Sequence, residues 1–201
     1  MGGKRVKGVT VAILAGGQGR RLHGLDKGLI PILGSSLVER ILQTLPEGIP
    51  RLIIANRNLC AYRALGVPVV NDPWPDFRGP LAGVLAALRT ATTPWVHIIP
   101  CDAVILPDDL LSRLTTRAGH ELRAVYAASG GQGHYLCCLL HRSLEADLAA
   151  ALDNGERAPR RWLASIGAQP VDFSDVQPEP LWSVNIPADM AHACARLSRG
   201  S

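Results

Sequence analysis

The sequence predicts an α/β fold in which helices cover both faces of a mostly parallel β-sheet. Short apolar runs of strand length alternate along the chain with segments whose apolar residues recur at helical spacing. Hydrophobic residues make up 47% of the chain but aromatic residues only 4%, so Leu, Val, Ile and Ala must build the core, which suits helices packed on a sheet. Because 201 residues fill one core, we expect a single domain over residues 1–201, with residues 1–8 as a disordered lead-in.

The individual elements follow from these patterns. In the first expected helix, Leu37, Val38, Ile41 and Leu42 recur at helical spacing. Helices are expected over residues 37–45, 81–89, 143–152 and 160–166, with two more beginning at Pro107 and Pro187. Strands are expected over residues 9–14, 51–55, 67–70, 95–99, 122–127, 135–140, 170–173 and 181–184. Ligands of such folds bind beyond the carboxyl ends of the strands, so the residues that follow each strand are the candidates for a site.

Charge and hydropathy restrict the class of ligand. The formal net charge is +4, but the Lys and Arg residues are scattered and few aromatic residues lie between them. A nucleic-acid surface would concentrate both, so we expect no nucleic-acid partner and instead a site for a small polyanion such as a phosphate. No apolar run reaches the roughly 18 residues that a membrane span needs, so we expect no membrane association.

The cysteines and the histidine within an expected strand are interpreted as structural. The five cysteines include no C-x-x-C pair, which indicates reduced thiols in a cytoplasmic protein. Cys137 and Cys138 should point to opposite faces of one strand. Cys101 is interpreted as a small buried apolar residue, not a nucleophile, and His97 as a core residue, not a ligand.

A glycine-rich segment, L-A-G-G-Q-G, follows the first expected strand at Leu14–Gly19. Glycines let the backbone approach an anion closely, and their N–H groups can cradle a phosphate. The spacing matches neither a Walker A loop nor a dinucleotide-binding fingerprint. A plain tight turn between a strand and a helix remains the alternative.

Cations cluster directly after this loop. Arg20, Arg21 and Lys27 lie within one short segment, where they could neutralise the charge that builds on a leaving pyrophosphate. The alternative is a solvated, charged loop.

An acidic residue ends the most hydrophobic central strand. Asp102 follows the run from Trp95 to Ile99, and burying a carboxylate there is costly unless it has a partner. Mg²⁺ binds through one or two carboxylates together with phosphate oxygens, so Asp102 is the candidate metal ligand. A helix cap is the alternative, although Asp108 and Asp109 lie nearer to the next helix.

The remaining strand ends carry more ambiguous signals. Asn56 and Asp72 could contact a base or a ribose, or they could simply form turns. The G-P-L-A-G segment, Gly79–Gly83, presents amide groups at the start of a helix, which is favourable for an anion.

Together these segments resemble a known family. The string L-A-G-G-Q-G-R-R-L-H-G-L-D-K-G-L at residues 14–29 resembles the L-A-G-G-x-x-x-R-M…D-K signature of sugar-nucleotide and cofactor nucleotidyltransferases. With F-R-G-P-L-A-G, A-N-R and P-C-D it is similar to the molybdenum cofactor guanylyltransferases, over residues 9 to about 114 and more weakly beyond.

The resemblance implies a Rossmann-like three-layer sandwich of nucleotidyltransferase type and the transfer of GMP from GTP to the terminal phosphate of molybdopterin, with Mg²⁺ as cofactor. It implies catalytic roles for Arg21, Lys27 and Asp102, with Asp102 on the metal. It implies a nucleotide site made of Leu14, Ala15, Gly16, Gly17, Lys27, Asn56, Asp72 and Asp102. A monomer is expected, with molybdoenzyme-specific chaperones as candidate partners.

Two departures from the family pattern keep alternatives open. Ile54 and Ser183 stand where the family commonly has Asn. A relative that uses CTP or another phosphate acceptor is one alternative, and a non-catalytic paralogue that binds nucleotide or molybdopterin is another. Retention of both Lys27 and Asp102 favours catalysis, because binding alone needs no metal carboxylate. Arg157, Arg160 and Arg161 are candidates to bind an anionic acceptor, or they form the solvated face of a helix; Asn185 is a further candidate.

Overall fold

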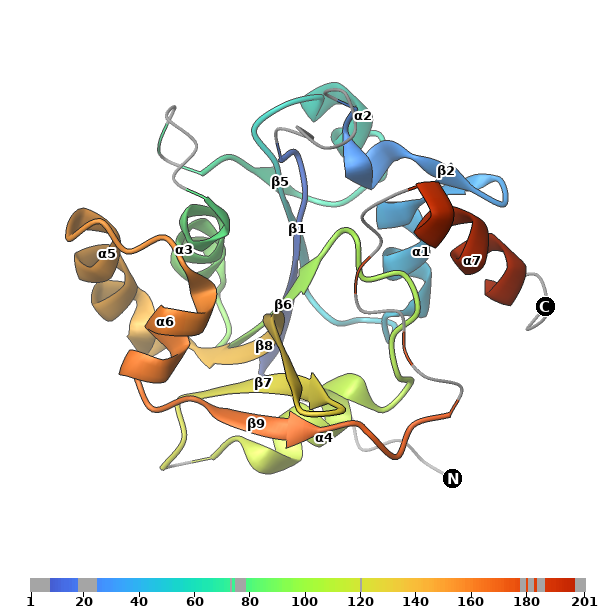
Figure 1. The fold of residues 1–201 in the computed structure, drawn as a ribbon. Helices are drawn as coiled ribbons and strands as arrows, with labels where there is room; N and C mark the ends of the chain where they lie inside the picture. The colour runs from blue at the N-terminus through green and yellow to red at the C-terminus, as the bar shows by residue number, and fades with distance from the viewer. Residues whose placement is uncertain are drawn as a thin grey trace.

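The computed structural model of the chain describes residues 8–17, 25–72, 74, 79–119, 121–177, 180, 183 and 187–197, except for the side chains of 187–190 and 192. These residues form a central sheet between two layers of helices (Figure 1). The predicted α/β sandwich around a mostly parallel sheet is therefore confirmed.

The central sheet has seven strands in the order β5-β4-β1-β6-β8-β7-β9. The strands are β1 Val9–Leu14, β4 Arg51–Ile54, β5 Val69–Val70, β6 Trp95–Pro100, β7 Ala124–Ser129, β8 Gln132–His141 and β9 Gln169–Asp172. Neighbours pair in parallel except at β8, which runs antiparallel to β6 and β7. Two short strands, β2 Pro31–Ile32 and β3 Ser35–Ser36, form a separate hairpin.

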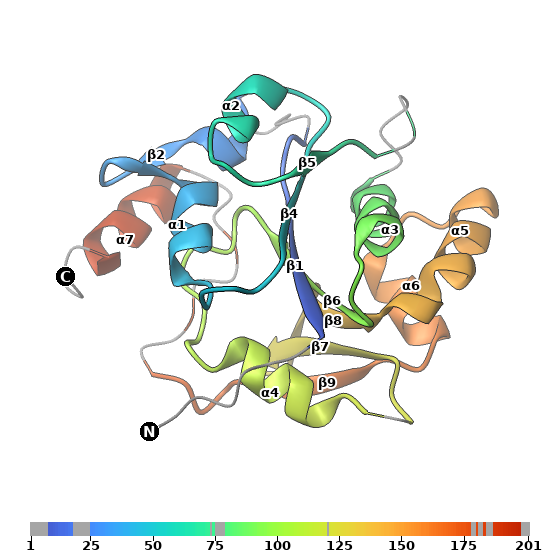
Figure 2. The same cartoon turned by 180° about the vertical axis from the view of Figure 1, so that it is seen from behind.

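Helices cover both faces of the sheet, as the view from behind also shows (Figure 2). One face carries α3 Pro80–Thr90, α5 Glu145–Asp153 and α6 Pro159–Ser165. The other face carries α1 Leu37–Thr44, α2 Leu59–Arg63 and α4 Leu110–Arg117, with α7 Pro187–Leu197 beside α1. Two 3-10 turns, η2 Lys27–Leu29 and η3 Arg142–Leu144, complete the elements of the described residues.

The first helix shows how the sequence specifies an element. Ser36 Oγ accepts a hydrogen bond from the Glu39 amide at 3.3 Å, and the Glu39 carboxylate accepts one from the Ser36 amide at 2.6 Å. This reciprocal capping box satisfies backbone donors that the first turn would otherwise leave unpaired. The apolar face predicted from the spacing, including Val38 and Ile41, is buried against the sheet.

Alternation of side chains along the strands divides the core into two clusters, one on each face of the sheet. On β1, Val11 and Ile13 face the α1 side, whereas Ala12 faces the α3 side. Cys137 and Cys138 lie on opposite faces, as predicted. All five cysteines are free thiols.

The strand order changes direction at β1. The chain proceeds from β1 to β4 and β5 on one side of it and then returns to β6 on the other side. Leu14, the last residue of β1, is therefore in register with Ile54 of β4 and Pro100 of β6. Ligands of open α/β sheets bind at such a switch point.

Several predicted elements differ in detail. Helices do not alternate with strands throughout, because β7 and β8 form a hairpin whose Gly130 and Gly131 adopt φ of 54° and 78°. The helix expected from Pro107 begins at Leu110, after a turn over residues 108–109. The short helix α2 and the β2–β3 hairpin were not predicted. The strand predicted over 181–184 and the lead-in predicted over 1–8 lie outside the described residues, except for Ser183 and Gly8.

Among the helices that the structure describes, none has the length and apolar character that crossing a membrane requires.

His97 is a core residue, as predicted, but its ring is not satisfied. It lies within β6 with 1% of its surface exposed, and neither ring nitrogen has a hydrogen-bond partner among the described residues. Burial lowers the pKa of His97 from its ordinary value of 6.5 to about 3. The folded protein therefore holds this imidazole neutral over a pH range in which the unfolded chain protonates it.

The His97→Leu variant should lose part of the acid sensitivity of the fold. Because the folded pKa lies below the unfolded one, stability is full above about pH 6.5 and falls by about 1.4 kcal/mol per pH unit between there and pH 3. Urea unfolding at pH 7.5 and pH 5 measures this slope. Ile98→Leu, a change on the same strand without a titratable group, should keep the wild-type slope; equal slopes in all three proteins would contradict this interpretation.

Candidate functional site

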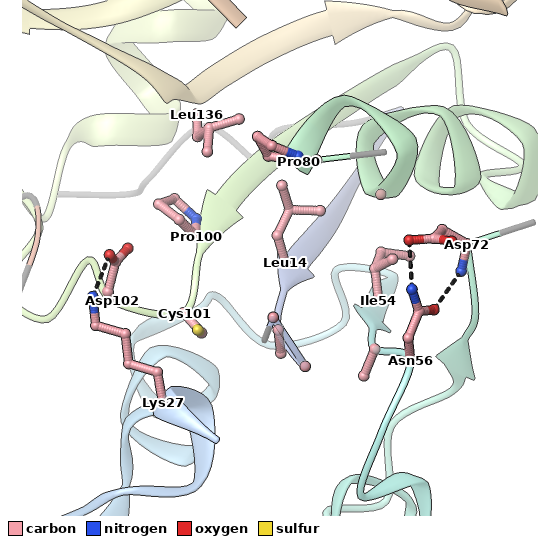
Figure 3. A pocket seen from close by; sticks show the side chains of 16 residues that line it. Leu14, Lys27, Ile54, Asn56, Asp72, Pro80, Pro100, Cys101, Asp102 and Leu136 are labelled. Carbon is pink, nitrogen blue, oxygen red and sulfur yellow. Dashed lines mark hydrogen bonds and ion pairs between the residues drawn. The ribbon is translucent and has the colours of Figure 1, made fainter. Parts of the chain in front are cut away.

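A pocket of about 560 Å³ opens at the carboxyl ends of β1, β4, β5 and β6. Figure 3 shows it with Lys27 and Asp102 at one end and Asn56 and Asp72 at the other. Its lining consists of Leu14, Ala15, Gly16, Gly17, Lys27, Ile54, Ala55, Asn56, Asp72, Gly79, Pro80, Gly83, Pro100, Cys101, Asp102 and Leu136.

The loop after β1 is braced against the neighbouring strand end. The Ala15 amide donates to the Ile54 carbonyl at 2.8 Å. Gly16 has φ of 66°, and a Cβ added there would lie 2.8 Å from the Asn56 backbone nitrogen. Only glycine fits this conformation and this close approach, so the loop has a fixed position at the pocket wall.

The apolar floor of the pocket depends on a second glycine. A Cβ at Gly83, on α3, would lie 3.2 Å from Leu14 Cδ2 and 3.4 Å from Ile54 Cγ2. Because glycine allows the helix to lie close to the strands here, Leu14 and Ile54 form a continuous surface with α3. The residue that departs from the family pattern, Ile54, is therefore part of this floor and is 3% exposed.

Asn56 and Asp72 hold each other at one end of the pocket. Asn56 Nδ2 donates to Asp72 Oδ2 at 2.5 Å, and the Asp72 amide donates to Asn56 Oδ1 at 2.9 Å. The Trp74 amide donates to Asp72 Oδ1 at 3.1 Å. These contacts fix the Asp72 carboxylate, whose oxygens can each accept a further hydrogen bond.

Lys27, Asp102 and Ser183 meet at the opposite end. Lys27 Nζ lies 2.8 Å from Asp102 Oδ2, with 19% and 21% of the two side chains exposed. Ser183 Oγ donates to the same Oδ2 at 3.0 Å. A lysine and a carboxylate 75 positions apart in the sequence thus form one charged group at the pocket wall.

The donor set fits a Mg²⁺ ion that arrives with phosphate. No three His, Cys, Asp or Glu side chains of the described residues are grouped as a self-sufficient metal site. Asp102 offers a carboxylate at the Lys27 end of the pocket, and its side-chain contacts with Lys27 and Ser183 both fall on Oδ2. Mg²⁺ is commonly held by one or two carboxylates and substrate phosphates, which is the arrangement this site allows.

A buried polar cluster behind Lys27 escaped the sequence analysis. Asp26, 8% exposed, accepts hydrogen bonds from Tyr62 Oη at 2.6 Å and from Asn58 Nδ2 at 2.9 Å. Arg57 Nε lies 3.5 Å from its Oδ2. The contacting residues are 31 to 36 positions away from Asp26, so no local sequence pattern predicts the cluster. The available signal was a tyrosine within a short, otherwise apolar segment.

A second, adjoining pocket of about 340 Å³ shares Pro100, Asp102 and Leu136 with the first. His134, Tyr135, Arg160 and Ser183 contribute its polar side chains. His134 Nε2 and Ser129 Oγ lie 3.0 Å apart in a hydrogen bond, and the Tyr135 ring packs on Tyr126 with centroids 5.0 Å apart. Asp102 therefore stands between two cavities.

Two of the three arginines considered for the acceptor have other partners. Arg157 donates to the carbonyls of Leu152 and Glu156, at 2.8 and 2.7 Å, at the end of α5. Arg161 pairs with Glu156 at 2.8 Å, and this contact holds the pKa of Glu156 at about 2. Arg160, which lies between these two arginines in the sequence, lines the second pocket.

Cys101 has the apolar role expected of it. Burial, together with the neighbouring Asp102 charge, raises the pKa of the Cys101 thiol to about 12. A thiol of this kind is not ionised near neutral pH and is a poor nucleophile.

The structure brings the described members of the predicted nucleotide site together. All eight of the residues predicted to contact nucleotide line the first pocket. Arg20, Arg21 and Asn185 lie outside the described residues. Leu81 and Ala82 of the G-P-L-A-G segment are buried in the first turn of α3, whereas Gly79, Pro80 and Gly83 line the pocket.

The fold and the pocket together define a nucleotidyltransferase: a doubly wound sandwich with a glycine loop, a lysine and a carboxylate gathered at its switch point. Residues 11–171 match the model of the MobA-like NTP transferase domain. The chain belongs to this family, and the resemblance to the molybdenum cofactor guanylyltransferases is confirmed.

Two curated relatives and one solved structure illustrate the match. The molybdenum cofactor guanylyltransferase of Serratia proteamaculans is 43% identical over 170 residues, 84% of this chain and 86% of the relative. That of Yersinia pestis is 41% identical over 182 residues, 90% and 92% of the two chains. The fold is similar to that of molybdopterin-guanine dinucleotide biosynthesis protein A from Archaeoglobus fulgidus, with a TM-score of 0.78 at 21% identity over 94% of this chain and 99% of that one.

Two adjacent glycines offer a matched test of the loop geometry. Gly16→Ala should lower the free energy of unfolding by about 1–3 kcal/mol, because the methyl group meets a backbone nitrogen at a positive φ. Gly17→Ala, where a Cβ meets nothing within 4 Å, should change it by less than about 0.5 kcal/mol. Chemical denaturation of both variants measures the difference, and equal stabilities would show that the loop is not constrained at Gly16.

Proposed function

We propose that the protein transfers GMP from GTP to the terminal phosphate of molybdenum-bearing molybdopterin and releases pyrophosphate. The observation that carries this proposal is the Lys27–Asp102 pair at the wall between two cavities. One cavity has the lining expected for a nucleotide, and the other offers cationic and polar side chains for a second anionic substrate. The names of the curated relatives support the same reaction.

The larger pocket suits GTP with its base at the Asn56–Asp72 end and its triphosphate at the Lys27–Asp102 end (Figure 3). The fixed Asp72 carboxylate can accept hydrogen bonds from the N1–H and N2–H₂ donors of guanine. Adenine and cytosine present an acceptor ring nitrogen at the corresponding edge, so they would place a lone pair against the carboxylate and form at most one of these two hydrogen bonds. The apolar floor of Leu14 and Ile54 supports the face of any base and adds no selectivity.

The chemistry needs charge neutralisation and alignment more than proton transfer. A phosphate monoester is largely ionised near pH 7, since its second pKa is about 6, so the acceptor oxygen needs no general base. This oxygen forms a bond to the α-phosphorus of GTP as the bond to the β-phosphate oxygen breaks, and the electron pair leaves with pyrophosphate. Lys27 and the loop amide of Gly17 stabilise the triphosphate charge.

Asp102 would hold the magnesium ion on the boundary between the cavities. When bound, Mg²⁺ would supply further neutralisation of the phosphate oxygens around the reacting phosphorus. Lys27, now paired with Asp102 at 2.8 Å, would be free to contact the triphosphate once a cation replaces it on the carboxylate.

The second pocket suits the phosphate end of the acceptor. Arg160 contributes a planar donor that matches a phosphate group, and His134 and Ser183 contribute further polar groups. A substrate bound in this pocket would approach Asp102 from a different cavity than the nucleotide, so its phosphate could reach the α-phosphorus beside that carboxylate.

Asp102→Asn should retain the fold and lose at least about 100-fold in turnover, the typical cost of one lost charge-stabilising group at a reacting phosphate. Formation of labelled dinucleotide from GTP and molybdopterin with Mg²⁺ measures this loss, and circular dichroism checks the fold. Asp108→Asn, which changes an exposed carboxylate in the following turn, should behave as the wild type. Full activity of Asp102→Asn would remove this carboxylate from the mechanism.

GTP should bind more tightly than ATP or CTP by roughly tenfold to a few hundredfold, because each buried unpaired polar group costs about 1–3 kcal/mol. Titration calorimetry of each nucleotide with Mg²⁺ measures the order, and Asp72→Ala should reduce the preference by weakening GTP alone. Binding of CTP as tight as that of GTP would contradict the guanylyl assignment and favour a cytidylyltransferase.

A further inference from the structure

We propose that Tyr62 is a positioning residue for the transfer reaction: through Asp26 it holds the backbone of Lys27 at a fixed distance from the glycine loop. This inference rests on the proposed function for its catalytic consequence. Tyr62 lines neither of the two pockets described above and is completely buried, so it acts through Lys27 and touches no substrate.

The Tyr62 hydroxyl joins two walls of the nucleotide pocket. It donates to Asp26 Oδ1 at 2.6 Å, directly before Lys27. The backbone N–H of Gly16, in the loop after β1, faces the same hydroxyl. The phenol therefore lies between the glycine loop and the segment that carries the lysine.

The residue on the other side of Lys27 also packs on this hydroxyl. A Cβ at Gly28 would lie 2.5 Å from Tyr62 Oη, and Gly28 does not have a positive φ that would otherwise explain the glycine. Glycine is required here because the phenol occupies the space of a side chain. Asp26 and Gly28 thus fix the Lys27 backbone from both sides against one group.

Both oxygens of the Asp26 carboxylate have partners of their own. Its second oxygen accepts from Asn58 Nδ2 at 2.9 Å, and Arg57 Nε lies 3.5 Å from it. Asn58 adopts φ of 52°, a conformation in the left-handed region that asparagine tolerates better than most residues. Burial and the hydrogen bond to Asp26 raise the pKa of Tyr62, so the hydroxyl keeps its proton near neutral pH and remains a donor.

Backbone placement matters for a lysine because its side chain is long and flexible. The rotatable bonds of its four-carbon side chain leave the ammonium free to sample many positions. A displacement of a catalytic group by about 1 Å can cost roughly 100-fold in rate. An anchored Lys27 backbone restricts the ammonium to positions near Asp102 and the triphosphate end of the pocket.

A double-mutant cycle separates this role from a purely structural one. Tyr62→Phe, which keeps the ring and removes the hydroxyl, should lower kcat/KM for GTP by about tenfold, with thermal stability changed modestly. In a Lys27→Ala background the same change should have no further effect on kcat/KM, because the hydroxyl acts through the lysine. Tyr126→Phe, a tyrosine of the β7 strand outside both pockets, serves as the control and should leave kcat/KM unchanged.

Equal, additive losses in the wild-type and Lys27→Ala backgrounds would overturn the proposal, as would unchanged activity of Tyr62→Phe. If Tyr62→Phe does not fold, Asp26→Asn replaces it in the cycle. This change weakens the hydrogen bond from Tyr62 while keeping an acceptor oxygen, and the loss of kcat/KM that it causes should also disappear in the Lys27→Ala background. GTP affinity, measured by thermal shift with Mg²⁺, is the parallel readout. A wild-type protein that binds GTP but transfers no GMP would refute the proposed function. The double-mutant cycle of Tyr62 and Lys27, measured as GTP affinity, would in that case still test whether Tyr62 positions the lysine.

Discussion

The parallel pairing of β1 with both β4 and β6 is the constraint on which the site depends. Because these strands are in register at Leu14, Ile54 and Pro100, the segments that follow them leave the sheet at one edge. The glycine loop, Asn56 and Asp102 reach the same pocket for this reason alone. The switch in strand order at β1 thus brings together site residues that are spread over nearly ninety positions of the sequence.

The charges at the site depend on support from polar groups that the pocket itself does not contain. Lys27 contacts Asp102 in front, while Asp26 behind it is satisfied by Tyr62 and Asn58. Glycines at 16 and 28 permit the close approaches that this packing needs. The site therefore combines two parts. The Lys27–Asp102 ion pair is exposed enough to exchange partners, whereas the buried network around Asp26 fixes the backbone position of the lysine.

Much of this could be predicted from the sequence, because the strongest signals are local. The β1 strand was predicted with its observed bounds, and glycines or acids directly after strands identified the pocket lining. Both strands of the β7–β8 hairpin were expected, but their antiparallel pairing was not, although Gly130-Gly131 is a turn signal, because the alternation of strands and helices favoured a parallel sheet. The Tyr62–Asp26 contact and the choice of Arg160 over Arg157 and Arg161 depend on tertiary packing, which no spacing in the sequence encodes.

If one chain joins two substrates across Asp102, the products of a single reaction will show it. Purified protein would be incubated with GTP, Mg²⁺ and molybdenum-bearing molybdopterin, and the mixture analysed by mass spectrometry alongside an enzymatic assay for pyrophosphate. We expect a guanine dinucleotide of the pterin and one pyrophosphate for each dinucleotide formed. Release of inorganic phosphate from GTP in place of pyrophosphate, or the absence of a dinucleotide while GTP remains bound, would contradict it.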